Sequence, residues 1–162
     1  MDKTPLISVV TVSYNAVSTI EQTILSVINQ TYPNIEYIII DGGSTDGTVN
    51  IIKKYTDKIA FWVSEPDKGI YDAMNKGIRI ATGDWINFMN SGDRFAQTEV
   101  LTLLFDHNFC LSSYGGIYGD AMFTQSGEPV GYFLNKPLWN LKYKFVGMGI
   151  CHQSLFVRMD LA

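Results

Sequence analysis

Two patterns of hydrophobic residues alternate along the first 95 residues of this 162-residue chain. Short runs of consecutive apolar residues are typical of strands buried on both faces, and they indicate strands at 7–12, 36–40, 60–63 and 85–89. Between these runs, apolar residues recur every three or four positions, which predicts helices at about 20–30, 49–55 and 70–81. Because strands and helices alternate, the pattern favours an α/β fold with a mainly parallel central sheet flanked by helices.

The second half of the chain has a less regular pattern. It indicates a helix at 99–108, strands at 117–124 and 129–134, and a last strand within 150–157. The segment 136–149 is aromatic and irregular. At 162 residues the chain is too short for two ordinary domains, so we expect a single domain over 1–162. Since no closing helix or polar tail precedes Ala162, we also expect this domain to be truncated at its C-terminus.

Composition and charge narrow the range of functions. The chain is 46% hydrophobic, enough for one sizeable core, and its net charge of -4 without a long basic run disfavours a nucleic-acid surface. The N-terminal residues do not resemble a signal peptide, and no apolar run is long enough to span a bilayer. Cys110 and Cys151 have the spacing of neither a metal site nor a disulfide scaffold, so free thiols in a reducing cytoplasm are expected.

Polar residues and glycines follow the predicted strands where each strand ends. The clearest case is the segment 41–48, in which Asp41, two glycines and several hydroxyl residues follow an apolar run. In open α/β sheets, ligands bind outside the carboxyl ends of the strands, where a carboxylate can hold a hydroxyl or a base edge. A turn and a helix N-cap, with Ser44 or Thr45 as the cap, explain the same residues equally well. This segment alone therefore leaves both interpretations open.

Six short strings occur in order between residues 8 and 93, and they anchor a resemblance that extends from residue 6 to residue 158. They are SVVTVSYN at 8–15, SVINQTYP at 26–33, DGGSTDGT at 41–48, MNKG at 74–77, ATGD at 81–84 and NSGD at 90–93. Together they resemble the family 2 glycosyltransferases of the GT-A fold, in particular the bacterial branch that builds capsule, O-antigen and exopolysaccharide. A dinucleotide oxidoreductase is disfavoured, because YNAVS rather than G-x-G-x-x-G follows the first strand.

The resemblance implies an enzyme with a Rossmann-like GT-A domain. Residues 1–95 would bind the nucleotide-sugar donor, and residues 96–162 would begin the acceptor-binding half. The implied reaction is an inverting transfer of a sugar from a nucleotide-diphosphate sugar, with a UDP-sugar as the first expectation, to a hydroxyl of a growing surface glycan or lipid-linked acceptor. A non-catalytic nucleotide-sugar-binding or partner domain is the alternative.

A divalent cation, Mg²⁺ or Mn²⁺, is the implied cofactor, with weak binding in the absence of the donor. No nucleic-acid partner is implied. We expect the protein in the cytoplasm, with peripheral association at the inner face of the membrane as a further option.

The strings also imply which residues bind the nucleotide sugar. These are Thr11, Ser13, Tyr14, Asn15, Asp41, Gly42, Gly43, Ser44, Lys68, Asp72, Asn75, Asn90 and Ser91. Gly42 stands where many relatives carry a second acid that meets the base edge, so uridine is not assumed. Tyr14 offers a ring for stacking on the base, with packing under the first helix as the alternative. Asp72 and Lys76, four positions apart, are also explained by an exposed ion pair, and we expect Lys76 to be structural.

Asp93 is the metal ligand that the resemblance implies. Relatives carry two or three acids in this string, whereas Asn90 and Gly92 take two of those places here. One carboxylate and the phosphates of a donor are enough to hold Mg²⁺ or Mn²⁺. A β-turn of polar residues is the alternative.

The general base is not assigned. In relatives it is an aspartate downstream of the His-Gln string seen here at His152, so we expect it beyond Ala162, with Asp120 and His152 as the remaining candidates. Five aromatic residues are candidates for stacking on a sugar, with core packing as the default: Tyr132, Phe133, Trp139, Tyr143 and Phe145.

Overall fold

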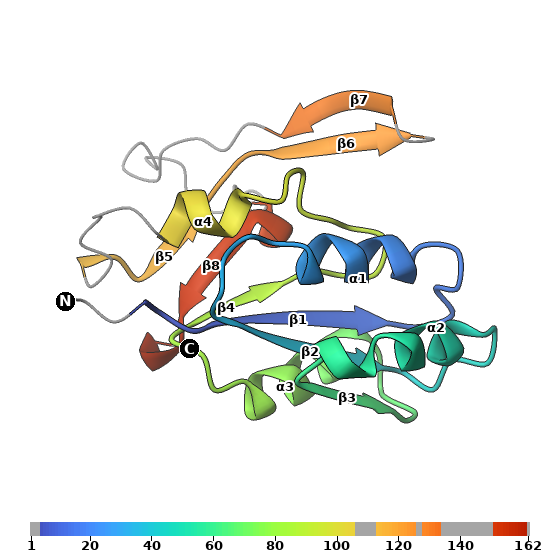
Figure 1. Ribbon diagram of the computed structural model, residues 1–162. Coiled ribbons are helices and arrows are strands. Elements are labelled where there is room, and N and C mark those ends of the chain that lie inside the picture. The colour runs from blue at the N-terminus through green and yellow to red at the C-terminus, as the bar shows by residue number, and fades with distance from the viewer. Residues whose placement is uncertain (1–3, 106–112, 126–127, 134–150, 162) are drawn as a thin grey trace, which may run out of the picture.

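A six-stranded sheet forms the centre of the molecule. The computed structural model describes residues 4–105, 113–125, 128–133 and 151–161. Within them the strand order is β3-β2-β1-β4-β8-β5, and β6 pairs with β7 in a separate two-stranded sheet (Figure 1). The first four strands are β1 (Ile7–Ser13), β2 (Ile35–Asp41), β3 (Phe61–Ser64) and β4 (Trp85–Phe88). All pairings among these four are parallel, which confirms the expected α/β fold with a mainly parallel sheet.

Helices cover both faces of this sheet. They are α1 (Ile20–Ile28), α2 (Thr48–Lys54), the 3-10 turn η1 (Thr56–Lys58), α3 (Ile70–Ile80) and α4 (Val100–Phe105). Buried residues of α1, α2 and α4 share one hydrophobic cluster with alternate residues of β1 and β2. Residues of α3 pack on the other face, against the intervening positions of the same strands (Figure 1). Because β1 is buried along its whole length, its apolar run has the pattern of a strand covered on both sides.

The second half adds antiparallel strands to the sheet. β8 (Leu155–Arg158) pairs antiparallel with β4, and β5 (Gly116–Tyr118) pairs antiparallel with β8. The hairpin of β6 (Ala121–Gln125) and β7 (Glu128–Phe133) lies apart from the six-stranded sheet (Figure 1). Two 3-10 turns, η4 (His152–Ser154) and η5 (Met159–Leu161), flank β8.

Two expectations for the second half differ from the structure. The strand expected at 117–124 is divided between β5 and β6, because the chain leaves the sheet at Gly119 and Asp120. The last strand is shorter than expected, since His152 lies in a 3-10 turn and not in the strand. Five residues discussed above lie outside the described residues: Cys110, Trp139, Tyr143, Phe145 and Ala162. The same holds for 106–108 of the expected helix and for the segment 136–149.

Candidate functional site

The carboxyl ends of three parallel strands lie side by side. Ser13 at the end of β1 pairs with Asp41 at the end of β2, and Asp41 pairs with Ser64 at the end of β3. On the other side of β1, the backbone N–H of Ser91 donates to Val12 O at 3.0 Å, which holds the segment after β4 beside the end of β1. The polar segments that the sequence places after these strands therefore meet at one edge of the sheet.

The carboxylate of Asp41 binds these strand ends together. Its Oδ1 accepts from Ser13 Oγ at 2.8 Å and Ser44 Oγ at 2.6 Å, and its Oδ2 accepts from Ser44 N at 2.8 Å and Ser64 Oγ at 2.6 Å. The side chain is fully buried. Burial acts to raise the pKa of Asp41, but the hydrogen bonds from Ser44, Ser64 and Ser13 outweigh it and lower the pKa below its ordinary value. Asp41 is thus an ionised group with both oxygens occupied by protein donors.

The loops that follow β1 and β2 are joined by side-chain hydrogen bonds. The backbone N–H of Asn15 donates to Ser44 Oγ at 2.7 Å, and Asn15 Oδ1 accepts from Thr45 N at 3.0 Å. Asp46 accepts from the backbone N–H groups of Val17 and Thr48. Since α2 begins at Thr48 with Gly47 as its N-cap residue, neither Ser44 nor Thr45 caps this helix.

Tyr14 and Thr11, both expected to bind the nucleotide sugar, differ in their exposure to solvent. Tyr14 is 67% exposed at the strand end, so its ring is available for stacking. Thr11 is fully buried, and its hydroxyl lies 3.1 Å from the hydroxyl of Tyr37 inside the core. The structure therefore brings Ser13, Tyr14 and Asn15 to the edge of the sheet, whereas the side chain of Thr11 faces the interior.

The start of α3 carries the second group of expected residues. Lys76 Nζ lies 2.9 Å from Glu65 Oε1 and 3.8 Å from Asp72 Oδ2, which agrees with the structural role expected for Lys76. The hydrogen bond from Lys76 to Glu65 raises the pKa of Lys76. Lys68 is exposed, and its ammonium group has no ion-pair partner in the described part of the chain. Asn75 is exposed on the same helix.

The segment after β4 forms a tight turn held by α1. The N–H of Asp93 donates to Asn90 O at 2.9 Å, and Gly92 takes a positive φ of 102°. The buried hydroxyl of Thr23 accepts from Gly92 N at 3.0 Å and donates to Asp93 O at 2.8 Å. The β-turn that was the alternative to a metal site is therefore present, and it fixes the backbone from which the candidate metal ligand projects.

His152 and Gln153 come to this turn from the other end of the chain. The ring atom His152 Nε2 lies 3.1 Å from Asn90 Nδ2. Burial raises the pKa of Asp93, and this rise is opposed by a hydrogen bond from Gln153 and by the charge of His152. Because the N–H of Gly119 donates to Ser154 O at 3.1 Å, the connection that carries the exposed Asp120 lies beside η4.

Sequence reasoning missed the residue that positions His152. Asn87 is fully buried in β4, and its Nδ2 donates to Gln153 O at 3.0 Å and to Leu155 O at 2.9 Å. A polar residue within an otherwise apolar strand was the only available signal. Asn87 thereby attaches the η4 turn to the sheet.

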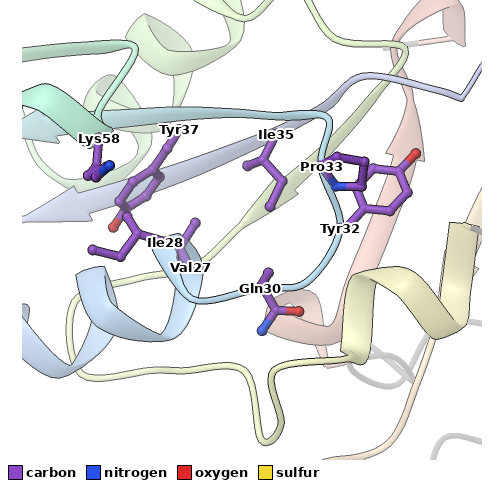
Figure 2. Close-up of a pocket in the computed structure, with 8 residues that line it drawn as sticks. All are labelled: Val27, Ile28, Gln30, Tyr32, Pro33, Ile35, Tyr37 and Lys58. Carbon is purple, nitrogen blue, oxygen red and sulfur yellow. The ribbon is translucent and has the colours of Figure 1, made fainter.

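A cavity of about 180 Å³ lies elsewhere in the molecule. It is lined by Val27, Ile28, Gln30, Tyr32, Pro33, Ile35, Tyr37 and Lys58 (Figure 2). Since Ile35 begins β2 and Asp41 ends it, the cavity lies toward the amino ends of the strands. Its walls hold no carboxylate, so it supplies none of the chemistry gathered at the opposite edge.

These polar strand ends can be compared with those of known proteins. The model of Glycosyl transferase family 2 matches residues 8–161, which is nearly the whole chain. The chain belongs to this family. It is 34% identical over 139 residues to TuaG of Bacillus subtilis, which is described as a glycosyltransferase of teichuronic acid biosynthesis, and the match covers 82% of this chain and 54% of TuaG.

Solved structures of glycosyltransferases share the fold. Staphylococcus aureus TarS 1-349, in complex with UDP-GlcNAc, matches with a TM-score of 0.71 and 22% identity over 96% of this chain and 46% of TarS. The mannosyltransferase PcManGT from Pyrobaculum calidifontis, in complex with GDP-Man and Mn²⁺, matches with a TM-score of 0.57 and 25% identity over 62% of this chain and 31% of PcManGT. The GT-A fold is thereby confirmed.

The chain spans 39% to 60% of the length of curated relatives such as TuaG. In the described part of the chain, each helix is too short or too polar to traverse a membrane.

Proposed function

We propose that the chain is the donor-binding part of an inverting glycosyltransferase that moves a sugar from a nucleotide-diphosphate sugar to a hydroxyl of a surface glycan. One observation carries the proposal: the ends of β2, β1 and β4 are hydrogen-bonded side by side. They present an exposed aromatic ring beside the end of β1 and a turn with a carboxylate after β4. The base of the donor would bind beside that ring and a cation at that turn, with the diphosphate between them.

Residues 1–95 supply the groups for the donor in this proposal. The ring of Tyr14 stacks on the base, and Asp41 acts as a positioning residue that holds the loops after β1 and β2. Lys68, in the loop just before α3, is the cation for the diphosphate, because its charge is not already paired as that of Lys76 is.

The turn after β4 fits a divalent cation. Its donors are the carboxylate of Asp93 and the amide Oδ1 of Asn90, which is buried and has no hydrogen-bond partner among the described residues. Oxygen ligands of this kind suit Mg²⁺ and Mn²⁺. His152 lies against Asn90 and would orient its amide. In the described residues no three His, Cys, Asp or Glu side chains group together, so donor phosphates would complete the coordination.

When bound, such a cation stabilises the negative charge of the departing diphosphate. Two buried residues would keep this site in place. Thr23 fixes the turn through its hydrogen bond to Asp93 O, and Asn87 fixes the η4 turn, which contains His152, through its hydrogen bond to Gln153 O. No described residue is assigned as the general base, and Asp120 and His152 remain the candidates. The acceptor would approach from the side of η4 and β5, where both residues lie.

Calorimetric titration with UDP, GDP and dTDP, each with and without Mn²⁺, tests this function. UDP and GDP are chosen because TarS and PcManGT bind UDP-GlcNAc and GDP-Man. We expect binding that Mn²⁺ strengthens in the wild type and in Asp57→Ala, an exposed control. In Asp93→Ala, Mn²⁺ should no longer strengthen binding. Absence of binding by all three nucleotides at millimolar concentrations would contradict the proposal.

A further inference from the structure

The carboxylate of Asp67 occupies the space next to Gly42. A Cβ added to Gly42 would lie 2.7 Å from Asp67 Oδ2 and 3.4 Å from Cδ2 of the Tyr14 ring. Any side chain at position 42 would therefore collide with the carboxylate. Because Gly42 has no side chain, the acid of the loop after β3 and the ring at the end of β1 both lie within contact distance of one point at the strand ends.

One oxygen of Asp67 is anchored and the other is available. Oδ1 accepts from the backbone N–H of Gly69 at 2.8 Å, which fixes the direction of the carboxylate. For Oδ2, no donor lies within hydrogen-bonding distance among residues that the structure describes. Asp67 is partly exposed and Tyr14 is 67% exposed, so a ligand can reach both. At the same edge, Asp41 has both oxygens occupied.

An available carboxylate oxygen beside an exposed aromatic ring discriminates between nucleobases. A base that stacks on the ring presents its Watson–Crick edge to the side. Uracil, thymine and guanine carry an N–H group in the middle of that edge, which a carboxylate accepts. Cytosine and adenine carry an unprotonated ring nitrogen there, whose lone pair the carboxylate repels, so only the exocyclic amino group at one end of the edge can donate to it.

We infer that Asp67 is the residue that selects the donor nucleotide by its base, and that Gly42 is required to give its carboxylate room. The site would accept uridine, thymidine and guanosine diphosphate sugars and would reject cytidine and adenosine diphosphate sugars. This inference rests on the proposed function, since it concerns the base end of the same donor.

Affinities for UDP, GDP, CDP and ADP, measured by calorimetry with Mn²⁺ present, test the inference. The wild type should bind UDP or GDP at least about tenfold more tightly than CDP and ADP, as expected for one charge-assisted hydrogen bond gained against one repulsion. Asp67→Asn should reduce this preference, because an amide both donates and accepts. Gly42→Ala should reduce it too, because its methyl group displaces the carboxylate without removing it.

The exposed control Asp57→Asn should keep the wild-type preference, and circular dichroism should show that every variant keeps the wild-type fold. Equal affinities of the wild type for all four nucleotides would overturn the inference and leave the proposed function intact. If a folded Asp67→Asn variant kept the wild-type preference for UDP or GDP over CDP and ADP, this result would also overturn the inference and leave the proposed function intact. If the wild type bound none of them, the proposed function itself would fail, and the inference with it.

Discussion

Asn90 and His152 are 62 positions apart in the chain, and their side chains meet with Nδ2 and Nε2 separated by 3.1 Å. The amide oxygen of Asn90 is left buried without a partner among the described residues. A buried polar atom without a hydrogen bond costs stability unless a ligand satisfies it. The contact therefore holds an amide whose oxygen has no hydrogen-bond donor among the described residues.

Replacing that amide with a carboxylate should strengthen cation binding. In Asn90→Asp, a charged oxygen takes the place of Oδ1, and we expect Mn²⁺ affinity in the presence of UDP to rise about three- to tenfold. Titration followed by the electron paramagnetic resonance of free Mn²⁺ measures it. Asn50→Asp, on the exposed face of α2, is the matched control and should leave the affinity unchanged. Equal affinities of the two variants would argue against Asn90 as a ligand.

Removing His152 should loosen the same site indirectly. His152→Ala leaves the amide of Asn90 without its ring contact, and the loss of an orienting partner costs about tenfold or more in metal affinity. We expect Mn²⁺ affinity to fall while the affinity for metal-free UDP changes by less than about twofold. A fall in both affinities would indicate that His152 contacts the nucleotide.

Asp41 should stabilise the fold in a pH-dependent way. The pKa of Asp41 in the folded protein is lowered below the ordinary value of 3.8. Its contribution to the free energy of unfolding is therefore complete above pH 3.8 and is lost as the pH falls through the folded pKa. Asp41→Asn replaces one acceptor oxygen with a donor group facing hydroxyls or an N–H, and we expect a loss of about 1–3 kcal/mol in the free energy of unfolding at neutral pH.

Urea unfolding at a series of pH values measures this contribution. The difference in free energy of unfolding between the wild type and Asp41→Asn should become smaller as the pH falls below 3.8. A difference that stayed constant over that range would show that ionisation of Asp41 does not stabilise the fold.

Lys68 and Lys76 form a matched pair for testing diphosphate binding. Lys68→Gln should weaken UDP binding about three- to tenfold and reduce its dependence on salt, because an unpaired exposed cation is removed. Lys76→Gln should leave UDP binding within about twofold, because its ammonium group is already paired with Glu65 and Asp72. Calorimetry at two salt concentrations compares them. If Lys76→Gln weakened UDP binding more than Lys68→Gln did, Lys76 and not Lys68 would be the residue that binds the diphosphate.

Gly77 should be required for close packing of α3 on β1. A Cβ at this position would overlap a methyl group of Val10, a buried core residue. Gly77→Ala should destabilise the protein by about 1–3 kcal/mol from overpacking, despite the higher helix propensity of alanine. Thermal unfolding measures it, with the exposed Arg79→Ala on the same helix as control. An increase in stability would mean that α3 can shift without cost.

The first half of the fold was predictable because its signals are local. Runs such as 7–12 and 36–40 mark buried parallel strands, and polar residues after each run mark the candidate site. The family followed from the same strings. The division between β5 and β6 was not predictable, since Gly119 and Asp120 interrupt a run that is otherwise regular.

The contacts within the candidate site were only partly predictable. That Asp41 would face the edge follows from its place at the end of β2, but the three serines that surround it come from three different segments. The approach of Asp67 to Gly42 depends on how two loops pack, and no local pattern encodes that distance. Thr11 lies on the same buried face of β1 as Val9, and its hydroxyl meets that of Tyr37 on the neighbouring strand.

Nuclear magnetic resonance can locate the bound nucleotide and cation together at the proposed donor site. Amide resonances recorded with UDP and Mn²⁺, and again with UDP and diamagnetic Mg²⁺, show which backbone groups lie near the paramagnetic ion. We predict strong broadening by Mn²⁺ at Gly92 and Asp93, and UDP-dependent shifts at Gly42 and Gly69. Broadening centred instead on the cavity beside Tyr37 and Lys58, or no change at the strand ends, would contradict this prediction.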